Sequence, residues 1–280
     1  MARFKFAACE WSFPCWGALA VRMAHEAGFE GMQLGDAGGS MHAYPLRDKW
    51  VQDYYLEAGE RYHVAFPQIH LYTLGHQCYY RNRLDSPEGR ICLESIKNAV
   101  IAASEMGVPS VIIDGMRMND PAKKRHVLDV AKYAVRIGEE YGVRIGMETD
   151  MTMEDTFAFL DALDGRLRLC FDAHNPVMYG TGYPPDMIRA LGKDRIDHIH
   201  VKESQANEDG FLSVETPIVL MGEGCTFFRE SAQAVRDTGF EGWIVSENFY
   251  FRPNILAQGY DCVSAARRDV ASLHAAYGTD

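Results

Sequence analysis

Long apolar runs are missing from this sequence, which has no stretch close to the roughly 18 consecutive apolar residues that a membrane-spanning helix needs. The N-terminal segment MARFKFAACEWSF places Glu10 where a secretory signal peptide would continue its apolar stretch. The sequence therefore argues against a membrane as partner, and we expect a cytoplasmic protein.

Paired cysteine motifs are missing as well. The seven cysteines include no CxxC pair, and their odd number is a poor match for a framework of disulfides. Disulfides persist mainly in oxidising compartments, so this pattern favours reduced, structural cysteines.

Positive charge is in short supply. Aspartate and glutamate number 39 against 28 lysines and arginines, which gives a formal net charge of −11. Proteins that hold a phosphate backbone do so with clustered cations. The composition therefore disfavours a nucleic acid as partner.

No low-complexity segment or linker interrupts the chain, so we expect one domain over residues 1–280. Within it a unit recurs, in which a short apolar run typical of a buried strand precedes an amphipathic stretch of helical period. The candidate strands are 4–11, 29–35, 65–72, 109–115, 144–149, 166–173, 196–203 and 242–249. The clearest candidate helices are 88–107, 122–142, 228–239 and about 261–277.

Glycine and proline punctuate this pattern. Four glycines stand just before strands, where the end of a helix favours a residue that tolerates positive φ: Gly28, Gly107, Gly142 and Gly239. Three prolines stand near helix starts, where a missing N–H costs little: Pro87, Pro121 and Pro185. The punctuation agrees with the periodicity.

Eight alternations over this length predict an α/β fold, a (β/α)8 TIM barrel, which typically needs about 250 residues. A doubly wound open sheet is the alternative. Its glycine-rich phosphate loop is missing after the first strand, where the chain has CEWSFPCWG instead.

The segment IDHIHVKES carries ionisable side chains in a run that otherwise predicts a buried strand. Alternate side chains of a strand face opposite sides, so His198, His200 and Lys202 share one face. The other face, with Ile199 and Val201, should meet the helices, which sends the first three side chains into the barrel. His200 should lie nearer than His198 to the C-terminal mouth, where such barrels keep their chemistry.

The same alternation brings one carboxylate from each of three further strands to the mouth. We expect Glu148, Asp172 and Glu247 to face inward beside His200. Three carboxylates in a low-dielectric pocket would raise one another's pKa, and a divalent cation removes that repulsion. Three oxygens and one nitrogen suit one Mn²⁺ ion, with Mg²⁺, Co²⁺ or Zn²⁺ as alternatives.

Each of these side chains also has an explanation without a metal. A single glutamate at a strand end is commonly solvated or half of an ion pair. His198, being deeper, suits a hydrogen-bonded core histidine better than a ligand. The occurrence of all four residues at the same height on successive strands is what favours a metal site.

A series of motifs runs along the chain in order: GFEGMQLG (28–35), MET (147–149), FDAHN (171–175), HIHVKE (198–203), GEG (222–224) and SEN (246–248). With these motifs the chain resembles the xylose-isomerase-like barrel superfamily of sugar isomerases and epimerases, which includes ketose 3-epimerases. The likeness covers nearly the whole chain. Its most specific part is the ordered series of Glu, Asp, His and Glu on strands five to eight.

The resemblance implies that Glu148, Asp172, His200 and Glu247 hold one divalent metal, and that the two glutamates also act as acid and base. It implies a sugar isomerase or epimerase that acts on a ketose or related keto-sugar. One carboxylate would remove a proton next to the carbonyl to form a cis-enediolate, and the other would return a proton to the opposite face.

Further substrate contacts follow from the resemblance. His70 matches a histidine that reaches the substrate in relatives, and Glu203 matches a substrate-contacting acid. Relatives commonly carry a histidine three residues after the metal aspartate. Here Asn175 stands at that position and His174 precedes it, so either side chain is a candidate for the contact.

Two more residues are candidate substrate contacts because of where they stand on the predicted strands. Lys202 faces inward one step beyond His200, and Trp11 stands at the end of the first predicted strand, where its ring could stack on a sugar face. The GEG turn could offer backbone N–H groups to a phosphate. Glu223 in its middle favours a neutral, unphosphorylated sugar instead.

Other functions share parts of this pattern. The same metal and bases would support elimination on a keto-sugar, as in dehydration of an inosose or cleavage of a C-glycoside. An abasic-site endonuclease would need more histidines and a basic face, and a non-catalytic sugar-binding protein would not need two acid/base carboxylates. The family resemblance also implies a homo-oligomer, a dimer or a tetramer.

Overall fold

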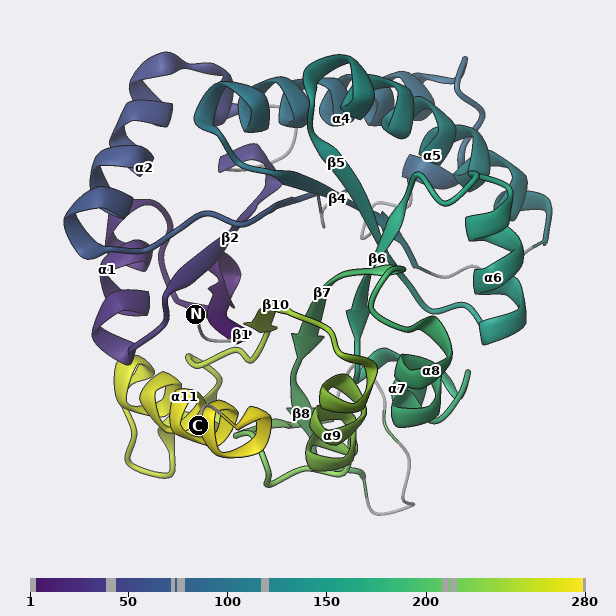
Figure 1. The fold of residues 1–280 in the computed structure, drawn as a ribbon. Helices are drawn as coiled ribbons and strands as arrows, with labels where there is room; N and C mark the ends of the chain where they lie inside the picture. The colour runs from purple at the N-terminus through teal and green to yellow at the C-terminus, as the bar shows by residue number, and fades with distance from the viewer. Residues whose placement is uncertain are drawn as a thin grey trace. The chain divides into compact units, whose positions relative to one another are not determined.

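The structure is a computed structural model, and it describes residues 4–38, 44–71, 74, 79–116, 121–207, 212 and 216–278. Within these residues, eight parallel strands close into a barrel in the order β1-β10-β7-β6-β5-β4-β3-β2. Helices alternate with these strands along the chain (Figure 1). The predicted (β/α)8 TIM barrel is thus confirmed, and the open doubly wound sheet is wrong.

The barrel strands are β1 (Phe4–Cys9), β2 (Gly31–Gly35), β3 (Ile69–His70), β4 (Ser110–Gly115), β5 (Arg144–Thr149), β6 (Arg168–Asp172), β7 (Ile196–Val201) and β10 (Gly242–Ser246). A separate antiparallel pair consists of β8 (Glu203–Ser204) and β9 (Ile218–Val219). The helices are α1 (Ala18–Ala27), α2 (Lys49–Tyr62), α4 (Pro87–Met106), α5 (Pro121–Tyr141), α6 (Met153–Asp161), α7 (Asn175–Tyr179), α8 (Pro184–Leu191), α9 (Phe228–Thr238), α10 (Pro253–Leu256) and α11 (Cys262–Tyr277).

Two compact units make up the chain, and the first comprises Met1–Met32, Ala58–Ala65 and Phe171–Asp280. In it β1 pairs with β10 and β10 with β7, while α1 packs on α11 and α8 on α9. Phe4 and Phe6 of β1 bury their rings against α11, where Phe4 meets Tyr277 edge-on with 5.5 Å between centroids. Burial of these rings ties the first strand to the last helix.

The second unit comprises Gln33–Glu57 and Phe66–Cys170. Its strands β3, β4 and β5 pair in parallel, and α4 and α5 pack on each other and on β4 and β5. Gly138 lets α5 approach the chain at the start of β5 closely, because a Cβ atom there would lie 2.5 Å from the carbonyl oxygen of Val143. The expectation of one domain over residues 1–280 stays a prediction.

The punctuation predicted from glycine and proline is confirmed. The glycines at the ends of α1, α4, α5 and α9 all have positive φ, as the left-handed conformation after a helix requires: Gly28, Gly107, Gly142 and Gly239. Pro87 opens α4, and the Ser86 hydroxyl before it accepts a hydrogen bond from the Gly89 amide. None of the described helices is long and apolar enough to cross a bilayer.

Seven of the eight predicted strands are shorter in the structure, and only 144–149 keeps its predicted bounds. The predicted strand 65–72 is reduced to Ile69–His70, with one isolated bridge from Ala65 to Gly31. Pro67 has no N–H for the ladder, which explains the interruption. The first strand ends at Cys9 because Glu10–Ser12 turn into a short 3-10 helix.

Candidate metal centre

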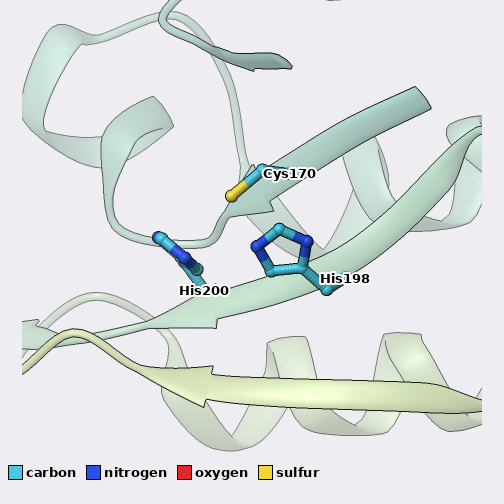
Figure 2. A group of neighbouring side chains, drawn as sticks. All are labelled: Cys170, His198 and His200. Atoms are coloured by element: carbon cyan, nitrogen blue, oxygen red, sulfur yellow. The ribbon is translucent and has the colours of Figure 1, made fainter. Parts of the chain in front are cut away.

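Strand β7 carries His198 and His200 on one face. Figure 2 shows the two imidazoles side by side along the strand, and their centroids lie 5.0 Å apart. Both side chains are completely buried, as an inward-facing position on this strand requires. His198 Nδ1 lies 3.1 Å from Asp197 Oδ2, which suits the predicted hydrogen-bonded core histidine.

Hydrogen bonds between neighbouring strands bring three of the predicted ligands to one level. Val245 of β10 stands opposite His200, and the Glu247 amide donates to the Val201 carbonyl at 2.9 Å. On the other side of β7, the Ala173 amide donates to the His200 carbonyl at 3.1 Å. Because Asp172 and Glu247 each flank this level, their carboxylates end up beside the imidazole of His200.

The Lys202 ammonium joins the two carboxylates. Its Nζ lies 2.7 Å from Asp172 Oδ2 and 2.5 Å from Glu247 Oε2. The second oxygen of Glu247 accepts a hydrogen bond of 3.1 Å from the indole N–H of Trp11, which is itself buried. Lys202 and Trp11 thus both contact the carboxylate of Glu247.

The charge on Glu247 is stabilised and not suppressed. Burial raises its pKa, but the Lys202 ammonium and the His200 ring outweigh burial and hold the pKa well below its ordinary value. We expected crowded carboxylates to raise one another's pKa, and for Glu247 that expectation is wrong. The physical reason is the positive charge of Lys202, because the expectation considered only the repulsion among the carboxylates.

His174 contacts both Asp172 and Ser204. Its amide donates to Asp172 Oδ1 at 2.7 Å, and its Nε2 lies 2.8 Å from the Ser204 hydroxyl of β8. Burial, with the positive charge of Lys202, lowers the pKa of the imidazole to about 4, so the ring is neutral at physiological pH. Asn175, the other candidate at this position, is also buried, at the start of α7.

The Glu203 carboxylate accepts hydrogen bonds from the loop that follows β9. The donors are the amides of Gly222, Gly224 and Thr226 and the Thr226 hydroxyl, at 2.6 to 3.2 Å. The side chain is 1% exposed. The GEG turn therefore presents two N–H groups, those of Gly222 and Gly224, to an internal carboxylate. The predicted contact of Glu203 with a substrate stays a prediction.

In the second unit, Glu148 and His70 form a pair of their own. Glu148 occupies the penultimate position of β5 opposite Asp114 of β4, and His70 ends β3. His70 Nε2 lies 3.7 Å from Glu148 Oε2, and both side chains are buried. Both residues thus lie at the C-terminal ends of their strands, as predicted.

The described residues contain two groups that could hold a metal ion. In each group, one ligand atom from every residue lies within 4.8 Å of the others. In the first unit, the first group comprises three of the four predicted ligands, Asp172, His200 and Glu247. To the second group the first unit contributes two imidazoles, those of His198 and His200 (Figure 2).

Asn248 and Asp269 were missed at the level of sequence. The Asn248 amide donates to Asp269 Oδ2 at 2.6 Å and to the Val219 carbonyl at 3.0 Å, while its own oxygen accepts from the Glu203 amide at 3.2 Å. Asp269 also accepts from the Met221 amide at 2.8 Å. An acid on the apolar stripe of the last helix was the available signal for this buried network.

Asp269 makes stability depend on pH. Burial raises its pKa from 3.8 to about 7, and hydrogen bonds offset only part of that rise. Between pH 4 and pH 7 the unfolded chain ionises this group and the folded chain does not, so stability falls as pH rises through this window by roughly 4 kcal/mol. Asp269→Asn cannot ionise, so its stability deficit relative to wild type should be larger at pH 5 than at pH 8.

Urea unfolding of both proteins at pH 5 and pH 8 measures this difference. Asp194→Asn, at an exposed position, is the matched control and should show no such dependence. A deficit of equal size at both pH values would mean that Asp269 is ionised throughout.

Comparison with solved structures places the same fold in several enzymes. The IolI protein, crystallised with a bound zinc atom, matches with a TM-score of 0.75 and 17% identity over 98% of both chains. D-allulose 3-epimerase from Methylomonas sp. matches with a TM-score of 0.72 and 15% identity over 98% of both chains. The probable 3-DHS dehydratase AsbF from Bacillus anthracis has a TM-score of 0.71 and 17% identity over 96% of this chain and 98% of its own.

Comparison with curated protein sequences found no match. A family model described as xylose isomerase-like TIM barrel matches residues 21–266, which is most of the chain. The closed barrel and the strand-end position of the acidic residues agree with that match. The chain therefore belongs to the xylose isomerase-like TIM barrel family.

Proposed function

We propose that this protein is a divalent-metal-dependent sugar isomerase or epimerase that acts on an unphosphorylated ketose or related keto-sugar. The observation that carries the proposal is the cluster of Asp172, His200 and Glu247, whose ligand atoms lie within 4.8 Å of one another. The fold neighbours include an allulose 3-epimerase, which supports the same reaction class.

The donor set fits a hard divalent cation. Three carboxylates and one imidazole match the ligands of Mn²⁺, and Mg²⁺, Co²⁺ and Zn²⁺ are alternatives. Glu148, Asp172, His200 and Glu247 would hold the ion. Bound there, it would polarise a ketose carbonyl and its neighbouring hydroxyl, which acidifies the C–H bond between them.

The protein's own residues then supply the proton transfers. One of Glu148 and Glu247 removes the proton next to the carbonyl, and the bonding electrons of that C–H bond form the cis-enediolate. The other carboxylate returns a proton to the carbon from the opposite face. The indole N–H of Trp11 donates to one oxygen of Glu247, which holds its carboxylate in one orientation.

The remaining predicted residues complete the proposal as substrate contacts. His70 lies beside Glu148, and His174 lies beside Asp172, so each is placed next to a proposed ligand. Asn175, Lys202, Glu203 and Trp11 belong to the same proposed set.

Elimination on a keto-sugar is the second candidate. It begins with the same proton abstraction, and the enediolate then expels a leaving group from the adjacent carbon instead of regaining a proton. The likeness to the dehydratase AsbF favours keeping this candidate.

Incubation with a panel of ketoses and inososes in D₂O with added Mn²⁺ tests both candidates. Isomerisation or epimerisation predicts deuterium at the carbon next to the carbonyl, seen by NMR and abolished by EDTA. Elimination predicts loss of water or of the aglycone, seen by mass spectrometry. If no member of the panel underwent exchange or elimination, that result would contradict the proposed function.

A further inference from the structure

Lys202 lies in an unusual place for a substrate-binding lysine. Its side chain is only 12% exposed, and its ammonium is within 2.7 Å of Asp172 Oδ2 and 2.5 Å of Glu247 Oε2. These two carboxylates belong to the group proposed to bind the metal. The same two carboxylates therefore bind the Lys202 ammonium in this structure and would also bind the divalent metal ion.

The two cations could not share these oxygens without strong repulsion. A divalent metal lies about 2.1 Å from a carboxylate oxygen. With the ammonium at 2.5 Å from the same Glu247 oxygen, the two positive centres would stand less than about 5 Å apart in a buried site. Screening by water is weak there, because His200, Asp172 and Trp11 around the pair are buried.

We propose that Lys202 is a built-in competitor for the metal: its ammonium and a divalent cation are alternative partners of Asp172 and Glu247. Metal binding releases the Lys202 ammonium from both carboxylates, and loss of the metal returns it. Lys202 thus lowers the affinity for metal and stabilises the protein when metal is scarce. This inference rests on the proposed function, because it uses the same ligand set.

The chemistry of the pair supports an exchange of partners. An ammonium donates three N–H bonds from a flexible four-carbon stem, so it can leave one set of acceptors without moving the backbone. Removing one partner of a buried ion pair leaves an uncompensated charge, which is strongly destabilising. Without Lys202, Asp172 and Glu247 would lose the ammonium that contacts both carboxylates, and a bound metal would replace its charge.

Lys202→Met tests the proposal, because methionine keeps the apolar stem and removes the charge. In protein stripped with a chelator, we expect Lys202→Met to bind Mn²⁺ at least tenfold more tightly than wild type by calorimetry. In EDTA its Tm should fall below that of wild type, and added Mn²⁺ should raise its Tm by more. Lys202→Arg keeps a positive charge and should bind Mn²⁺ within about threefold of wild type. Exposed Lys193→Met is the matched control and should change neither quantity.

A measurement on the wild-type protein covers the case in which Lys202→Met does not fold. Reductive methylation mapped by mass spectrometry should label Lys202 slowly in EDTA and several-fold faster with Mn²⁺, because the metal frees the amine. Lys193 should be labelled equally in both. Labelling of Lys202 that is unchanged or slower with Mn²⁺ would overturn the proposal.

The outcomes separate this inference from the proposed function. If wild type and Lys202→Met bind Mn²⁺ equally, or the variant binds it more weakly, while ketose exchange persists in wild type, only the competition is wrong. If Lys202→Met binds Mn²⁺ and wild type binds it barely, the competition is supported. If neither protein binds a divalent metal, the metal centre and the competition are both wrong.

Discussion

Glu247→Gln should lower kcat for ketose proton exchange by about 10³-fold, even at saturating Mn²⁺. Glutamine keeps the length and the hydrogen bond from Trp11, but its amide cannot accept the substrate proton. It also removes the negative charge that Lys202 and His200 stabilise in this site. The measurement is deuterium exchange by NMR over a range of Mn²⁺ concentrations, so that weaker metal binding is separated from the lost base.

Glu241→Gln is the matched control, since it makes the same change at an exposed position six residues earlier. Its exchange rate should equal that of wild type. If Glu247→Gln retained more than a tenth of wild-type kcat at saturating metal, Glu247 would not be a proton-transfer group. The acid and base roles would then have to be assigned elsewhere in the site.

Glu203→Ala should be the most destabilising single change at the loop that follows β9. It removes the acceptor of four hydrogen bonds, from the amides of Gly222, Gly224 and Thr226 and from the Thr226 hydroxyl. Unpaired donors in a buried position cost about 1–3 kcal/mol each, and relaxation of the loop recovers part of that. We expect a loss of about 3 kcal/mol, which lowers Tm by roughly 6–12 °C.

Thermal unfolding measured by circular dichroism checks this value. Glu203→Gln keeps one acceptor oxygen and turns the other into a donor that faces N–H groups, so its Tm should lie between the alanine variant and wild type. Glu230→Ala, on the exposed side of α9, should leave Tm within about 1 °C. A Tm of Glu203→Ala equal to that of wild type would mean that the loop does not depend on this carboxylate.

The helices and most strands were predictable because their signals are local. The predicted helix 88–107 is Pro87–Met106, and 228–239 is Phe228–Thr238, since periodicity and the flanking glycines act within a few residues. The predicted strand 65–72 is mostly wrong, because an apolar run does not identify hydrogen-bond partners and Pro67 has no backbone N–H to donate.

The candidate site was predictable only in part. Strand alternation placed His200, Lys202 and Asp172 on inward faces, because side-chain direction has a fixed period of two. Alternation could not reveal that Lys202 reaches both Asp172 and Glu247, because those contacts join residues 30 and 45 positions apart in sequence. The upward pKa shift expected for Glu247 was wrong for this reason.

The sequence by itself determined which residues can carry chemistry and on which face of each strand they lie, because both follow from residue type and local geometry. Only the tertiary structure decided which charges meet. Electrostatic contacts depend on distance in space, so the pairing of Lys202 with two carboxylates, the capture of a loop by Glu203 and the burial of Asp269 became visible only when distant segments were folded together.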